Sequence, residues 1–124
     1  MAKILLVDDD EDFVEMNKTL LEKEKHTVLT AFNGADGEAK AIADKPDLLI
    51  LDVMMDTKNA GFKVARELRA RPDTKSIPII MLTGVNQEVP FKFSPDDVWL
   101  PVDVFLEKPV KPGQILAAVK KVLK

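Results

Sequence analysis

The stretch Leu48-Leu49-Ile50-Leu51-Asp52 is the part of this sequence from which its fold can be worked out. Four apolar residues without a polar break are typical of a strand buried on both faces, as central strands of parallel sheets are. Pro46 ends whatever helix comes before the strand. Burial does not explain the acid that follows, but open α/β sheets bind ligands just beyond the carboxyl ends of their strands. Asp52 alone could equally be a loop residue or a helix N-cap, so its interpretation depends on the other strand ends.

Four more segments have the composition of short strands, and helical patterns separate them. These strands are expected over residues 3–7, 27–32, 77–82 and 104–106. Strands that alternate with helices indicate parallel βαβ units with right-handed crossovers. The predicted fold is therefore α/β: a flavodoxin-like, doubly wound five-stranded parallel sheet of order 2-1-3-4-5, with helices on both faces. We expect residues 1–124 to form a single domain.

Apolar residues at helical spacing predict which face of each helix packs on the sheet. The expected faces are Phe13, Met16, Leu20 and Leu21 in the first helix, Ala35, Ala39, Ile42 and Ala43 in the second, Val64, Ala65 and Leu68 in the third, and Ile115, Leu116, Val119, Val122 and Leu123 in the last.

Composition excludes several classes of function. The chain has 124 residues and no cysteine, so it has neither a disulfide framework nor thiolate chemistry, which fits a cytoplasmic protein. A net charge of −3 without a basic cluster argues against direct nucleic-acid binding. No apolar run reaches about 18 residues, so no membrane span is expected. The only histidine, His26, excludes a metal site made of several histidines, and we interpret it as a surface or strand-edge residue.

Polar residues stand at the carboxyl ends of the predicted strands. Asp8 and Asp9 follow the first strand, Asp52 ends the third, Thr83 the fourth and Lys108 the fifth. In the order 2-1-3-4-5 these strands are neighbours, so the side chains should converge at one rim of the sheet. Each residue alone has an ordinary explanation as a cap, a loop hydroxyl or a solvated charge. Their joint arrival at one rim is much harder to explain in that way.

Such a set of side chains suits phosphoryl transfer. Carboxylates at close quarters repel one another, and a hard divalent cation such as Mg²⁺ relieves this with oxygen ligands. A carboxylate can act as the nucleophile towards phosphorus and form an aspartyl phosphate. Lys108 offers a cation and Thr83 a hydroxyl to the phosphoryl oxygens.

With these residues at the strand ends, the sequence resembles the response-regulator receiver domain of bacterial two-component signalling. The matching motifs are Ile4-Leu-Leu-Val-Asp-Asp9, Leu48-Leu-Ile-Leu-Asp52, Met81-Leu-Thr83-Gly84 and Glu107-Lys108-Pro109. They occur in this order over essentially the whole chain. The resemblance implies a phosphoacceptor signalling switch and not an enzyme that turns over an external substrate. The implied partners are a sensor histidine kinase or a phosphotransfer protein, and an unknown downstream protein.

The resemblance also implies roles for individual residues. Asp52 would accept the phosphoryl group from a phosphohistidine, Lys108 would pair with it and Thr83 would swing towards it. Phe105 matches the aromatic switch residue of the family, and the Lys108–Pro109 bond is expected to be cis. The resemblance implies that Asp9 and Asp52 bind Mg²⁺ (or Mn²⁺) directly, that Asp8 binds it through a water molecule, and that the backbone carbonyl of Met54 is a further ligand.

The loop after Asp52 departs from the family pattern. Asp56 stands where the family usually has a proline, and reaching Gly61 takes one extra residue. We hypothesise that Asp56 tunes metal affinity or access to the site. Met54 and Val85 are apolar at positions that in receivers flank the path of the hydrolytic water, and this predicts slow autodephosphorylation.

A second departure lies between Thr83 and Lys108, which are 25 positions apart. Prolines within residues 86–101 exclude one continuous helix there, which predicts a remodelled output surface. Its large apolar residues are expected to pack on the sheet, with a partner-binding patch as the alternative: Phe91, Phe93, Trp99 and Leu100.

Three other functions remain open from the residues alone. A haloacid-dehalogenase-type phosphatase also uses an aspartate nucleophile and Mg²⁺, but this chain leaves no room for its cap. An FMN-binding flavodoxin would need a phosphate-binding loop after the first strand, where Asp8-Asp9-Asp10 would repel a phosphate. A receiver fold used only for protein docking, without phosphorylation, is the third alternative.

Overall fold

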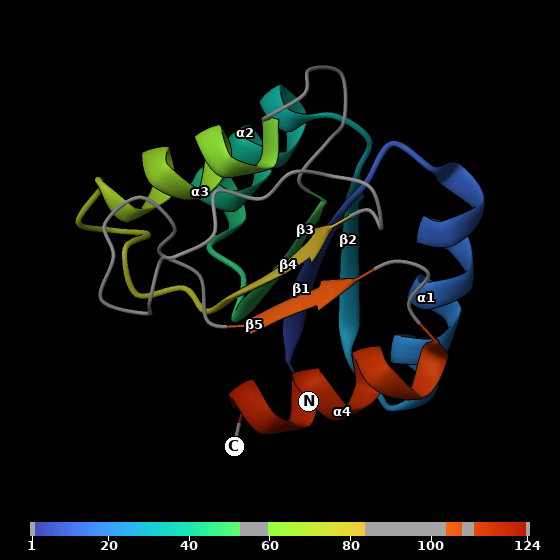
Figure 1. Cartoon of the computed structure of the whole chain (residues 1–124). Helices are drawn as coiled ribbons and strands as arrows, with labels where there is room; N and C mark the ends of the chain where they lie inside the picture. Colours follow the sequence, from blue (N-terminus) through green and yellow to red (C-terminus); the bar gives the residue numbers. More distant parts are fainter. Residues whose placement is uncertain (1, 53–59, 84–103, 108–110, 124) are drawn as a thin grey trace.

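One parallel sheet of five strands forms the centre of the molecule (Figure 1). The computed structural model describes residues 2–52, 60–83, 104–107 and 111–123. The strand order is β2-β1-β3-β4-β5, as the sequence predicted. The strands are β1 (Lys3–Val7), β2 (Thr27–Ala31), β3 (Leu48–Asp52), β4 (Ile79–Thr83) and β5 (Val104–Glu107).

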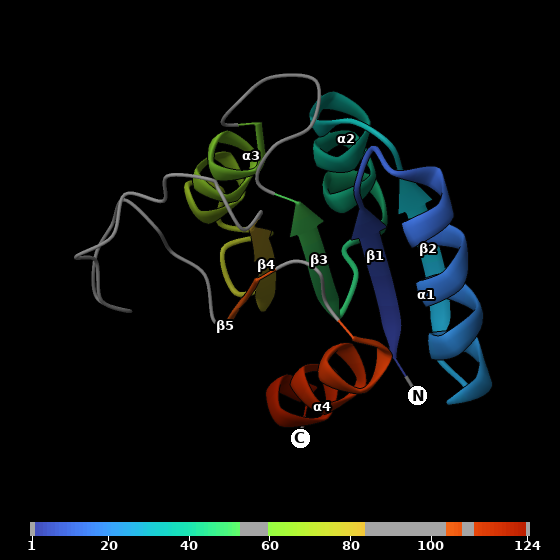
Figure 2. The ribbon, with the colours of Figure 1, turned by 45° about the vertical axis from the view of Figure 1, so that its right-hand side comes forward.

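Helices cover both faces of this sheet, as Figures 1 and 2 show. Within the described ranges they are α1 (Glu11–Lys23), α2 (Gly34–Asp44), α3 (Ala60–Arg69) and α4 (Pro112–Leu123). Side chains alternate along β1, so Leu5 and Val7 pack with α2 and α3 while Ile4 and Leu6 pack with α1 and α4. The two apolar layers make the doubly wound arrangement stable, because each face of the sheet is buried.

The central strand has the predicted bounds, and all five of its residues are buried. Three other strands differ at their ends from the prediction, and one of them is β5, which continues for one residue beyond 106, to Glu107. β2 stops at Ala31, and Phe32 beyond it is exposed. β4 runs from Ile79 to Thr83 and not from residue 77, and the carbonyl of Pro78 accepts the N–H of Leu49 just before the strand begins.

The predicted packing face of α1 is partly wrong. Met16 is 52% exposed, whereas Val14 and Asn17 are buried together with Leu21. Asn17 satisfies its side-chain amide within the helix by donating to the carbonyl of Phe13 at 2.8 Å. A polar residue can therefore face the core because its hydrogen-bonding groups are satisfied there.

The predicted packing face of α2 is wrong for its three alanines, whereas Ile42 is partly buried and packs against the core as predicted. Ala35, Ala39 and Ala43 are exposed, and the buried residues are Gly34, Gly37 and Ala41. A Cβ on Gly37 would lie 2.8 Å from Cγ1 of Val7, closer than carbon atoms approach one another. The helix lies on β1 at a distance that only glycine allows at this position, and alanine spacing could not reveal that.

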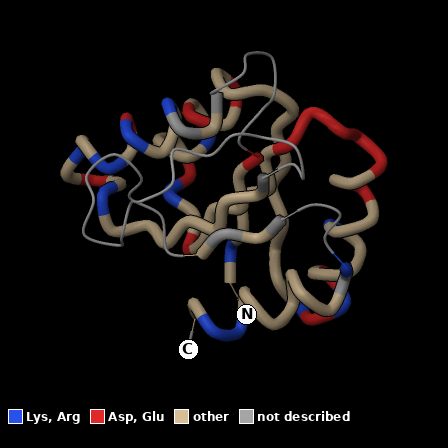
Figure 3. The backbone as a smooth tube through the Cα atoms, in the orientation of Figure 1, with Lys and Arg blue, Asp and Glu red and all other residues tan. Residues whose placement is uncertain are grey.

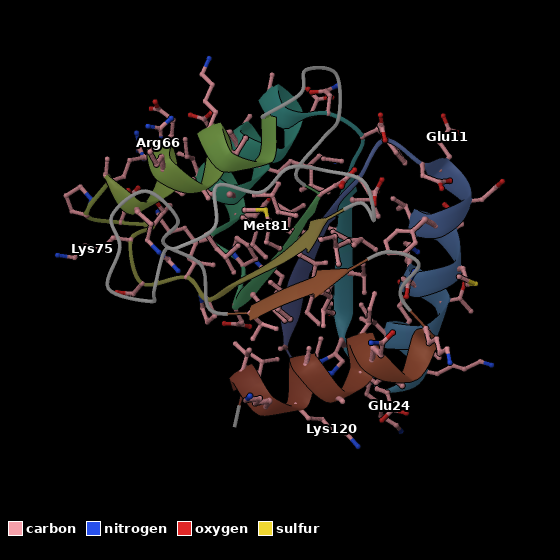
Figure 4. The ribbon with its side chains drawn as sticks, in the orientation of Figure 1. Glu11, Glu24, Arg66, Lys75, Met81 and Lys120 are labelled. Atoms are coloured by element: carbon pink, nitrogen blue, oxygen red, sulfur yellow. The ribbon has the colours of Figure 1, made fainter. Side chains whose placement is uncertain are left out.

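The predicted packing faces of α3 and α4 are confirmed for the residues at the centre of each face. Val64, Ala65 and Leu68 of α3 are buried, as are Ile115 and Val119 of α4. Met81, labelled in Figure 4, belongs to the apolar layer between the sheet and α2 and α3.

The connection from α3 to β4 is tied down by side-chain hydrogen bonds. The buried Thr74 donates its hydroxyl to the carbonyl of Leu68 at 2.6 Å. Arg69 donates to the carbonyl of Lys75 at 2.8 Å and to that of Ile77. The carbonyl of Leu68 also accepts the N–H of Arg71 at 3.2 Å, so the hydroxyl of Thr74 adds a second hydrogen bond at the end of α3.

Candidate phosphoacceptor and metal site

The acidic residues of the site lie where two neighbouring strands end. Val7 of β1 pairs with Leu51 of β3, so the residues that follow, Asp8 and Asp52, come at the same level of the sheet. Oxygen atoms of Asp8, Asp9 and Asp52 all lie within 4.8 Å of one another. Figure 3 shows the acidic run from the end of β1 into α1 at this rim. The structure thus brings together the three carboxylates that the sequence placed there.

Backbone hydrogen bonds hold Asp8 in place. Its N–H donates to the carbonyl of Ala31 at 3.1 Å, which anchors it to β2. Its Oδ1 accepts the N–H of Asp10 at 3.0 Å. Asp8 is fully buried, Asp52 is 4% exposed and Asp9 is exposed, so the cluster opens to solvent on the Asp9 side.

The donor set of this cluster fits a hard divalent cation. Carboxylate oxygens are preferred ligands of Mg²⁺, which usually takes one or two of them along with waters and a phosphate. Two buried negative charges at 4.8 Å, the upper limit of the separation here, repel by about 3.5 kcal/mol at an effective dielectric constant of about 20. A cation removes this repulsion, so the residues present suit a metal site.

Two further predicted residues are described only through their backbone. Thr83 is the last residue of β4 and pairs with Glu107, one position beyond the level at which Asp52 pairs with Leu82. It therefore ends its strand at the same rim as Asp52. Phe105 lies in β5 and pairs with Met81.

Several predicted features fall outside the described residues and stay predictions. These are Lys108, its cis bond to Pro109, the metal-ligating carbonyl of Met54, the tuning residues Asp56 and Val85, and the remodelled segment 86–101.

One residue of this region was missed as a contributor to the site. Asp10 is the N-cap of α1, and its side chain accepts the N–H of Phe13 at 3.2 Å. The signal was present in the sequence, because an aspartate directly before a helix with acids in its first turn is a typical N-cap. What the sequence could not reveal is that the N–H of Asp10 holds Asp8.

Across the part of the chain that the structure describes, we find no helix with the length and apolar character needed to span a membrane.

Known proteins resemble this chain in sequence and in structure. The protein PilH of Pseudomonas aeruginosa is 37% identical over 126 residues, covering 99% of this chain and 98% of PilH. The alkaline phosphatase synthesis transcriptional regulatory protein PhoP of Bacillus subtilis is 36% identical, and this chain spans only 48% of its length. The crystallised chemotaxis protein CheY4 of Vibrio cholerae has a TM-score of 0.85 and 31% identity, with 99% of each chain covered.

The family profile of the response regulator receiver domain matches residues 4–120. None of these comparisons favours the phosphatase or the flavodoxin alternative. With its parallel α/β sheet and the acidic cluster at the strand ends, this chain belongs to the response regulator receiver domains, the phosphoacceptor switches of two-component signalling.

Proposed function

We propose that Asp52 is the residue that accepts the phosphoryl group and that residues 1–124 act as one receiver domain. The observation that carries this proposal is the group of three carboxylates within 4.8 Å at the ends of β1 and β3. Asp52 is the member of this group that ends the central strand β3, which lies between β1 and β4 in the sheet. Family membership supports the same assignment.

In the proposed reaction an oxygen of Asp52 attacks the phosphorus atom of a phosphohistidine on a histidine kinase or phosphotransfer protein. A new O–P bond forms, and the N–P bond breaks with its electron pair left on the imidazole nitrogen. Only 4% of the surface of Asp52 is exposed, so a phosphoryl donor can contact only a small part of this side chain. The same reaction can use a small acyl phosphate as donor.

Asp8, Asp9 and Asp52, with the carbonyl of Met54, would hold Mg²⁺ or Mn²⁺. When bound, the cation supplies positive charge that neutralises the phosphoryl oxygens, which is the main requirement of phosphoryl transfer. Asp9 is exposed, so its carboxylate lies on the side from which an ion enters.

The remaining roles are assigned from the family pattern. Lys108 would pair with the phosphoryl group, Thr83 would donate its hydroxyl to it, and Phe105 would change rotamer in response. The added negative charge at the rim thereby biases a surface between two states that a downstream protein distinguishes. We place this exchange in the cytoplasm. The domain acts only on itself: it takes part in its own phosphorylation and in the hydrolysis of its own aspartyl phosphate.

The test is phosphorylation by acetyl phosphate, read as intact mass with and without Mg²⁺. We expect one added phosphoryl group that requires Mg²⁺ and is absent from Asp52→Asn. A folded Asp52→Asn variant that still gains the group would show that another residue is the acceptor. No addition to the parent protein under any condition would favour the docking-module alternative.

A further inference from the structure

Asp10 takes part in two hydrogen-bonded systems at once. Its backbone N–H donates to Oδ1 of the buried Asp8 at 3.0 Å. Its own carboxylate accepts the N–H of Phe13 at 3.2 Å, and its carbonyl accepts the N–H of Val14 at 3.0 Å. The first turn of α1 and the carboxylate of Asp8 are therefore joined through a single residue.

The geometry explains why the two systems depend on each other. Asp10 has the extended backbone of an N-cap, with φ −86° and ψ 102°. This conformation sets the direction of its N–H, and the bond from Phe13 to its side chain maintains the conformation. Asp8 is fully buried, so protein groups and not bulk water orient its carboxylate.

We propose that Asp10 is a positioning residue for the cation site: by capping α1 it holds the Asp8 carboxylate in the orientation that binds the metal. This inference rests on the proposed function, since it concerns the same site. Linkage makes the effect reciprocal, because a cation bound to Asp8 must in turn stabilise the cap.

The experiment compares Asp10→Asn with Asp10→Ala by calorimetric titration with MgCl₂. Both variants lose the charge of Asp10, but asparagine caps a helix as well as aspartate does and alanine does not. We expect Asp10→Ala to bind Mg²⁺ more weakly than Asp10→Asn, by up to about fivefold, because the free energy of the lost helix cap is the upper limit of its coupling to the metal. The comparison between them separates capping from the through-space effect of the charge.

Asn33 provides a matched control in the same protein. It is the N-cap of α2, and its side chain accepts the N–H of Asp36 at 2.8 Å. Asn33→Ala should lower stability as Asp10→Ala does, but leave the affinity for Mg²⁺ unchanged. An equal loss of affinity in Asn33→Ala would show that general destabilisation, and not the position of Asp8, weakens the site.

A second measurement needs no variant and remains valid if Asp10→Ala fails to fold. Amide hydrogen exchange of the parent protein is followed with and without Mg²⁺. We expect Mg²⁺ to slow exchange of the Phe13 and Val14 amides more than that of the Asp36 amide. Binding of Mg²⁺ without this difference, or equal affinities of the two Asp10 variants, would overturn the inference, whereas absence of Mg²⁺ binding to the parent protein would overturn the proposed metal site itself.

Discussion

Replacing Asp52 by asparagine should make the metal-free protein more stable. The substitution removes one of three negative charges that lie within 4.8 Å of one another and keeps nearly the same shape. The function of the site thus opposes stability, because the cluster is arranged for a cation that the metal-free protein lacks.

The magnitude follows from the burial of the cluster. Asp8 and Asp52 are both buried, and at the upper limit of their separation, 4.8 Å, their repulsion is about 3.5 kcal/mol for an effective dielectric constant of about 20. The pair with the exposed Asp9 adds about 1 kcal/mol, since water screens it with a dielectric constant of about 80. Imperfect hydrogen bonding of the new amide offsets part of this gain, by about 1–3 kcal/mol. The net expectation is an increase of about 1.5–3.5 kcal/mol in the free energy of unfolding.

Urea denaturation at neutral pH measures this change, once in EDTA and once in excess Mg²⁺. In EDTA, Asp52→Asn should unfold at a higher urea concentration than the parent with the same m-value. In Mg²⁺ the parent should gain stability by mass action, and the variant should gain much less.

Asp12→Asn is the matched control, because Asp12 is an exposed acid in the first turn of α1 and the net charge changes equally. This variant should be no more stable than the parent, since an acid favours a helix N-terminus. The reasoning fails if Asp52→Asn is less stable than the parent in EDTA, or if Asp12→Asn is stabilised to the same extent.

Four further predictions concern a helix–sheet contact, an ion pair and the phosphorylated site. Gly37→Ala should lower the free energy of unfolding by about 1 kcal/mol, because overpacking against Val7 outweighs the gain in helix propensity. The same substitution should raise stability in a Val7→Ala background, and equal effects in both backgrounds would refute the contact. Arg71 donates a hydrogen bond to Asp73 and holds the pKa of that carboxyl below its ordinary value, so the small stabilisation is present above the unfolded pKa of Asp73 and is lost as the pH falls through its folded pKa. In Arg71→Gln an NMR titration should find the pKa of Asp73 raised, and an unchanged pKa would contradict this. The purified phosphorylated protein should keep its phosphoryl group for many minutes, and Asp56→Asn should alter that lifetime or the affinity for Mg²⁺; loss within seconds refutes the first expectation, and no change in either quantity refutes the second.

The interactions in the α3–β4 connection illustrate what local pattern does not contain. The local sequence around Thr74 indicates only a turn, yet Thr74 is buried and its hydroxyl donates to the carbonyl of Leu68. Arg69 would be taken from the sequence for a solvated charge, but in the structure it donates to two carbonyls of the following turn. Such partners come from chain segments whose approach depends on the packing of the whole layer. In Figure 4, by contrast, Lys75 and Lys120 extend outward from the surface.

The sequence by itself determined the sheet and the place of its chemistry. Residues 48–51 are continuously apolar because the strand is buried on both faces, and this pattern can be recognised from the local sequence alone. The parallel order then follows from alternation and handedness, and with it the convergence of Asp8 and Asp52 at one rim.

Only the tertiary structure decided how the helices meet the sheet and how the site is held. Exposed Met16 and buried Asn17 have the opposite of their expected environments, because helix rotation is set by the surface against which the helix packs. Gly37 gains its importance only from the closeness of Val7, and Asp10 only from the direction of its N–H towards Asp8. Hydrophobic periodicity reports which residues avoid water, whereas contacts of a few ångströms depend on how separate elements fit together.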